Sequence, residues 1–228
     1  MPKLIVKQAS IDYYGAFASP AFELMGEGGR IMGGLSMALA SHNLRLTNFR
    51  TEVDIQDPSA NGIAVLLGRF GIYRFKFDQV QASLNGFDSS DLEGFITVVQ
   101  KGEGWLRETI KDFSFRNHIF VYSSHSALSE GTSSTYLLSL PRRNTPVLGE
   151  DQGSGLMETW QIPQWDAKMH FSLSHSGTET EGIYIHYMLV YERNMVDFAE
   201  IASNGIEMLY RILNGIGLEM SEESQIVL

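Results

Sequence analysis

Cysteine is absent from the 228 residues of this chain. Its absence excludes disulfide bonds, zinc–thiolate sites, iron–sulfur clusters and cysteine nucleophiles. A chain of this length buries a sizeable core without such cross-links. With 43% hydrophobic and 19% charged residues, the composition is that of an ordinary globular protein.

Long apolar runs and basic residues are also scarce. No run approaches the roughly 20 apolar residues that span a bilayer. The N-terminus lacks the cationic start, apolar stretch and cleavage site of a signal peptide, so we expect a cytoplasmic protein that does not bind membranes. Only 17 Lys and Arg stand against 27 Asp and Glu, giving a net charge of −10. Because nucleic-acid affinity rests largely on cations that neutralise phosphates, we expect no nucleic-acid partner.

The motifs of common enzymes and cofactor sites are missing as well. The glycine-rich run from Gly26 to Ser36 has no lysine and fits neither G-x-x-x-x-G-K-S/T nor G-x-G-x-x-G. We interpret Gly29 and Gly33 as sites of close packing or of a helix break. Serines lie near histidines at 123–134 and 172–177, but no G-x-S-x-G elbow presents a nucleophile. The sequence therefore predicts no catalytic residue, no metal site and no cofactor.

The segment from Ala167 to Glu192 carries the strongest structural signal. Two alternating runs, AKMHFSLSH and GIYIHYMLVYE, flank the polar turn SGTETEG. Strand side chains alternate between the two faces of a sheet, so a hairpin folded symmetrically about Glu179 has one oily and one polar face. The oily pairs are Met169–Leu189, Phe171–Tyr187 and Leu173–Ile185, and the other face carries His170–Met188, Ser172–His186 and Ser174–Tyr184.

The remaining periodicity predicts α+β architecture with a mostly antiparallel sheet. We expect a strand at 4–13, a helix at 20–42, a three-stranded meander at 49–78, a helix at 90–110, about five strands from 115 to 192 and a helix at 194–215. About three helices would pack on two meanders. These elements form a single domain over residues 1–217, with 1–88 and 89–217 as an alternative pair of related subdomains. Residues 218–228 are expected to form an acidic, partly disordered tail.

Two candidate functional surfaces follow. The polar hairpin face gathers His170, Ser172, Tyr184, His186 and Met188, with the two imidazoles as diagonal neighbours. A solvated face, a metal or acid–base pair, and burial beneath a helix or a partner are the three interpretations. At the open end of this hairpin Asp166 would face Glu192, and we expect the strands to diverge there because like charges directly opposite destabilise a sheet.

The second surface is a sheet edge around Trp160 and Trp165. Pro163 would confine the segment WQIPQW to an edge strand or a bulge, and such edges are natural sites of strand addition or subunit pairing. Core and rim packing is the alternative. The long loop from Pro141 to Gly155 is interpreted as a lid, an interface arm or a disordered segment.

For function, the sequence favours a non-enzymatic binding or assembly protein, a subunit of a homo- or hetero-oligomeric complex. Its partner would be another protein or a second copy. One alternative is a pocket protein in which the last helix grips the sheet around an apolar small molecule. A second is an enzyme without a recognisable motif that uses His170 and His186.

Overall fold

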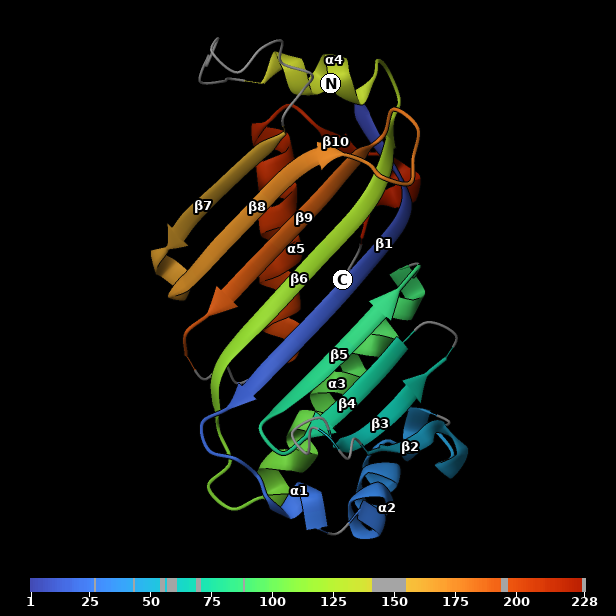
Figure 1. Ribbon diagram of the computed structural model, residues 1–228, viewed down its shortest axis with the longest axis vertical. Coiled ribbons are helices and arrows are strands. Elements are labelled where there is room, and N and C mark those ends of the chain that lie inside the picture. The colour runs from blue at the N-terminus through green and yellow to red at the C-terminus, as the bar shows by residue number, and fades with distance from the viewer. Residues whose placement is uncertain are drawn as a thin grey trace.

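Figure 1 presents a computed structural model of the chain, which describes residues 1–26, 28–42, 44–53, 56, 61–68, 71–87, 89–140, 155–193 and 197–226. The loop from Pro141 to Gly155 falls outside the described residues except for Gly155. The elements, in chain order, are β1 (Lys3–Phe17), α1 (Glu23–Gly26), α2 (Gly28–Ala38), η1 (Ala40–His42), η2 (Leu46–Asn48), β2 (Phe49–Glu52), β3 (Gly62–Leu67), β4 (Gly71–Lys76), β5 (Gln79–Asn85), α3 (Ser89–Thr109), β6 (Phe115–Leu128), α4 (Ser133–Ser139), β7 (Leu156–Ile162), η5 (Pro163–Trp165), β8 (Ala167–His175), β9 (Ile183–Tyr191), α5 (Phe198–Gly215), β10 (Glu219–Met220) and η6 (Glu222–Ser224).

All the strands belong to one sheet, which confirms the predicted α+β class with mostly antiparallel pairing. The order is β2-β3-β4-β5-β1-β6-β9-β8-β7, and β10 adds to β1 in parallel. The long strands β1 and β6 pair antiparallel along the middle and join what the sequence suggested were separate meanders. The first meander has a fourth strand, β5, whose Gln-, Ser- and Asn-containing sequence gave a weak strand signal.

The topology repeats about the β1–β6 pair. β1 begins a unit that continues through β2 to β5 and ends with α3, and β6 begins a second unit that continues through β7 to β9 and ends with α5. The last strand of each unit, β5 or β9, pairs with its first strand. We call the two units the first and second halves. The first half ends with α3 and the second begins with β6. In the alternative pair of subdomains suggested by the sequence, 1–88 and 89–217, α3 would belong to the second unit.

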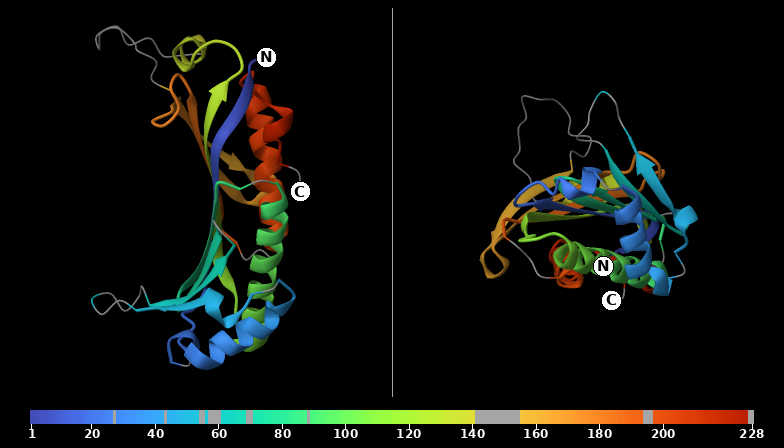
Figure 2. Two further views of the ribbon diagram at one scale, coloured as in Figure 1. Left: turned by 90° about the vertical axis from the view of Figure 1, so that its right-hand side faces the viewer. Right: turned by 90° about the horizontal axis from the view of Figure 1, so that it is seen from below.

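The two long helices α3 and α5 lie on the same side of the sheet (Figure 2). Glycines let each helix approach the sheet closely. A Cβ on Gly102 of α3 would lie 2.4 Å from the Tyr73 ring, and one on Gly205 of α5 would lie 2.6 Å from the Phe120 ring. The helix α3 continues through Gly102. The predicted helix at 20–42 is divided into α1, α2 and η1, and in this region Gly34, not Gly29 or Gly33, makes the close contact, which is with Trp105.

The hairpin register is as predicted, with Phe171 opposite Tyr187 and Ser172 opposite His186. The strands also diverge at the open end. Asp166 adopts a left-handed backbone conformation (φ 49°) before β8 begins, and Glu192 forms an ion pair with Lys168 at 2.6 Å. The oily face is buried, and α5 passes behind β8 and β9 (Figure 1).

One of the five strands expected between residues 115 and 192 differs from the structure. Residues 134–140, expected as a strand, are largely helical in α4, because the Thr132 side chain accepts a hydrogen bond from the Thr135 backbone and caps the helix. The C-terminal segment 218–228, expected as an acidic and partly disordered tail, includes β10 and η6, and its Leu218 and Met220 side chains are buried. Residues 227–228 lie outside the described part of the chain.

Candidate functional site

The five residues of the predicted polar hairpin face lie together on the side of the sheet opposite α3 and α5, which we call the open face. Ser172 pairs with His186, His170 with Met188, and Ser174 with Tyr184. The side chains of His170, Ser172, Tyr184, His186 and Met188 are all half-buried. The sequence therefore placed these residues on one face, although their role is a separate question.

The open face continues across β6, β1 and β5, which the sequence did not reveal. Ser123 pairs with Ser10 on one side and with His186 on the other. One row further along, Asp12 lies between Ser83 and Val121. Strand order decides this continuity, because β1 ends at Phe17 and β6 begins only at Phe115, yet the two strands lie side by side in the sheet.

The two histidines of the hairpin turn towards different strands. Nδ1 of His170 lies 3.0 Å from the Thr159 hydroxyl on β7, and Nδ1 of His186 lies 3.1 Å from the Ser123 hydroxyl on β6. Burial lowers the pKa of His186, and the nearby Asp12 charge opposes that shift. Among the residues that the structure describes, no group of three His, Asp or Glu side chains could hold a metal ion.

Two further histidines, His125 on β6 and His175 on β8, also lie within hydrogen-bond distance of hydroxyl groups. Nδ1 of His125 lies 2.9 Å from the Ser176 hydroxyl, and the His125 ring packs on Tyr184 with 4.7 Å between centroids. Nδ1 of His175 lies 2.9 Å from the Ser133 hydroxyl. These pairs join residues 42 to 51 positions apart, so adjacency in the sequence could not reveal them.

Some of the charged groups on the open face or at its rim have partners on that face. Asp12 accepts a 2.5 Å hydrogen bond from Ser83, and Arg74 pairs with Glu52 at 3.0 Å. Lys168 pairs with Glu192, as described above. Between these groups lies a half-buried apolar strip formed by Tyr14, Ile119, Val121, Met188 and Val190.

The predicted tryptophan edge is a true sheet edge, since β7 ends the strand order. Trp160 lies on β7 and Trp165 in the short helix η5 that follows it, and both pack partly buried against the core. On the other side of β7, Met157 is 84% exposed. Glu158, which pairs with Phe171, places a carboxylate on the helix-covered face of this edge, a feature that discourages strand addition.

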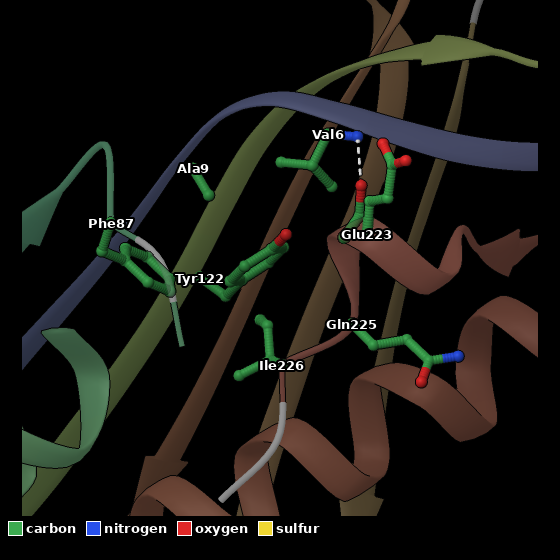
Figure 3. Close-up of a pocket in the computed structure, with 8 residues that line it drawn as sticks. Val6, Ala9, Phe87, Tyr122, Glu223, Gln225 and Ile226 are labelled. Atoms are coloured by element: carbon green, nitrogen blue, oxygen red, sulfur yellow. Dashed lines mark hydrogen bonds between the residues drawn. The ribbon is translucent and has the colours of Figure 1, made fainter. Parts of the chain in front are cut away.

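A pocket of about 160 Å³ lies where β1 extends beyond β5 and the C-terminal segment covers it (Figure 3). Its apolar walls are Val6, Ala9, Phe87, Tyr122 and Ile226. The segment is held by a 3.0 Å hydrogen bond from the Val6 backbone to Ser224. This volume is below the roughly 300 Å³ of a typical small-molecule site.

A buried polar cluster lies on the helix-covered side of the sheet, opposite the open face and within the hydrophobic core. The Tyr13 hydroxyl on β1 donates a hydrogen bond to Oε1 of Glu103 on α3, and it lies 2.8 Å from Nδ1 of His118 on β6. Glu103 is 2% exposed, and Tyr13 and His118 are 0% exposed. Phe198, the first residue of α5, packs its ring on Tyr13 with 4.4 Å between centroids.

Burial shifts the acid–base behaviour of this cluster. It raises the pKa of Glu103 to about 7, although the Tyr13 hydrogen bond and the Arg107 charge act in the opposite direction. Burial lowers the pKa of His118 to about 3, and the charge of Arg107 adds to this effect. At neutral pH His118 is therefore uncharged, whereas Glu103 is divided between its two protonation states.

The sequence contains a signal for this cluster, although none of its three residues was predicted as a functional residue. Glu103 occupies a position on the apolar stripe of α3, between Val99 and Leu106, where a carboxylate has no place unless it is paired. His118 likewise alternates with the buried Phe120 and Tyr122 along β6. A polar residue at a core position of an amphipathic element is thus the indication to look for.

Comparison with known proteins assigns no family, because neither the protein-family models nor the curated proteins that we searched match this chain. Within the described part of the chain, no helix has the length and apolar character needed to cross a membrane. Functional inference therefore rests on the open face and the buried cluster.

Proposed function

We propose that the protein is a non-enzymatic assembly protein that docks another protein chain on the open face of its sheet. The observation that carries the proposal is the apolar strip of Tyr14, Ile119, Val121, Met188 and Val190, which lies on the face opposite both long helices. It has a rim of Ser, His and paired charges.

This composition matches that of protein interfaces. Interface cores are depleted of charge and enriched in aromatic residues and Met, whereas their rims are polar. The strip holds Tyr14 and Met188 among aliphatic side chains. Of the charges near it, Arg74 and Lys168 are paired with carboxylates, and Asp12 accepts a hydrogen bond from Ser83.

The occupant that we propose for the open face is a second copy of the chain. Each copy carries a net charge of −10, so two copies repel one another over most of their surfaces. The open face is where opposite charges are paired and apolar groups are concentrated, so contact through it keeps this repulsion low. A homo-oligomer built through the open face follows from this reasoning.

Light scattering coupled to size-exclusion chromatography tests the proposal. We expect a mass well above 25.5 kDa. Met188→Lys should shift the particle toward the monomer, because an unpaired charge buried in an interface costs several kcal/mol, which weakens association at least about tenfold.

Met37→Lys is the matched control, since Met37 is 81% exposed on α2, outside the open face. It should leave the mass unchanged. A wild-type protein that stays at 25.5 kDa at high concentration would contradict self-assembly. A native particle of mixed composition would instead identify a different protein as the occupant.

The two alternatives have less support. Between α5 and the hairpin, the side chains of Phe171, Tyr187 and Leu189 are at most 1% exposed and fill the space that a helix-grip ligand would need. An enzyme that uses His170 and His186 would need both rings to face one reacting group, yet each binds a hydroxyl on a different neighbouring strand. If changing both histidines to Ala leaves binding and activity intact, the enzymatic alternative fails.

A further inference from the structure

The buried cluster joins the two halves of the fold. Tyr13 and Glu103 belong to the first half, on β1 and α3, and His118 belongs to the second half, on β6. The start of α5 lies close by: Asp197 caps this helix by accepting from the Ala199 backbone at 3.0 Å, and it also accepts a 2.5 Å hydrogen bond from Gln100 of α3. Glu103 therefore lies where the two halves meet, so a change in its protonation state occurs at their junction.

The Tyr13 hydroxyl has a single proton, so it can donate in only two directions, to Glu103 or to His118. When Glu103 is ionised, its oxygens only accept, so Tyr13 donates to Oε1 and His118 must donate from Nδ1–H to the Tyr13 oxygen. When the proton of a neutral Glu103 lies on Oε1, the carboxyl donates to the Tyr13 oxygen, and Tyr13 donates to an unprotonated Nδ1 of His118. In that arrangement the histidine proton is on Nε2.

We infer that Tyr13, Glu103 and His118 form a hydrogen-bond chain that reverses direction when Glu103 gains or loses its proton, so that the tautomer of His118 in the second half reports the charge of Glu103 in the first. The inference does not depend on the proposed assembly. In the reversal one proton is taken up from solvent and the net charge of the cluster changes from −1 to 0. Glu103 becomes neutral, Tyr13 remains a neutral phenol, and the single proton of neutral His118 moves from Nδ1 to Nε2.

The groups around Glu103 set the conditions for this reversal. A switch near neutral pH requires a carboxyl group that holds its proton more tightly than usual, as the burial of Glu103 ensures. It also requires a histidine that stays uncharged, as the burial of His118 ensures. The titratable or charged groups that act on the two residues come from each packed element: Tyr13 on β1, Tyr73 on β4, Arg107 on α3, and Asp197 before α5.

Nitrogen-15 NMR of histidine-labelled protein tests the inference, because long-range proton–nitrogen correlations distinguish the two tautomers. Between pH 5 and pH 9, the His118 ring should change from the Nε2–H form to the Nδ1–H form. The midpoint should coincide with that of the Glu103 carboxyl carbon, followed in the same samples. A His118 ring that keeps one tautomer while Glu103 titrates would overturn the inference.

Two variants distinguish a tautomer change transmitted through the hydrogen-bond chain from a general effect of pH on His118. Tyr13→Phe removes the central hydroxyl, and Glu103→Gln removes the titrating group, so in either variant the His118 tautomer should be constant over this pH range. A tautomer change that persists in a folded form of either variant would also overturn the inference. The wild-type measurement is decisive by itself should both variants fail to fold.

Discussion

Replacing Glu103 by Gln should stabilise the protein at alkaline pH and have little effect in acid. The ordinary pKa of 4.5 applies to the unfolded chain, whereas burial raises the pKa to about 7 in the folded protein. The folded state therefore binds this proton more tightly. The stability that the protonated carboxyl contributes is complete below pH 4.5 and is lost as the pH rises through about 7. Gln cannot ionise, so the variant avoids this loss.

The size of the effect follows from the two pKa values. The folded state loses about 1.4 kcal/mol per pH unit between the unfolded and folded pKa values, which amounts to about 3 kcal/mol between pH 4.5 and pH 8. We expect the free energy of unfolding of the variant, minus that of the wild type, to increase by about this amount over that range. Because the comparison is between two proteins at the same pH, titration of distant groups cancels.

The pKa of His118 determines how the unfolding free energy of each protein should depend on pH. Its pKa falls from 6.5 to about 3 on folding, so the stability it contributes is present above pH 6.5 and is lost as the pH falls toward 3. Between pH 4.5 and pH 6.5 the contributions of Glu103 and His118 oppose each other, and these two groups together leave the wild type nearly independent of pH. Without Glu103, the variant should lose about 2 kcal/mol as the pH falls from 6.5 to 4.5.

Urea unfolding at half-unit intervals from pH 4.5 to pH 8.5 measures these differences. Glu108→Gln is the control, because it removes an exposed carboxyl from the same helix without touching the buried cluster. A Glu103→Gln difference that is constant across the range would refute the reasoning, since it would mean that Glu103 titrates alike in the folded and unfolded states.

Three further substitutions test how the halves are packed, with the free energy of unfolding measured by urea in each case. Gly205→Ala should destabilise by about 1–3 kcal/mol, because the added Cβ would lie 2.6 Å from the fully buried Phe120 ring; an unchanged stability would show that α5 can move away from the sheet without cost. Met220→Ala should cost about 2–5 kcal/mol, because this side chain is 2% exposed, and a loss below about 0.5 kcal/mol would mean that the C-terminal segment does not hold to β1. Asp197→Ala should cost about 1 kcal/mol or more, since it removes both the cap of α5 and the acceptor of Gln100, whereas a neutral result would contradict the capping role.

The alternation of apolar and polar residues predicted the β8–β9 hairpin and also its register. A shift of one residue would move every side chain to the opposite face, so the burial of Phe171 and Tyr187 fixes Ser172 opposite His186. The same reasoning gave the α+β class and the face shared by the candidate residues. It failed for α4, where a short apolar segment suits either a strand or a helix and the Thr132 cap decides.

The tertiary structure alone decided which distant segments meet. No local pattern states that β1 pairs with β6, so the extension of the open face to Asp12 and Ser123 could not be read from the sequence. The same holds for the buried cluster: Glu103 and His118 are 90 and 105 residues from Tyr13, and the three meet only because β1 pairs with β6 and α3 packs on the helix-covered face of the sheet. The sequence by itself determined which residues face the core, because period and polarity are local properties. The partners of those residues depend on strand order and helix packing, which are properties of the whole chain.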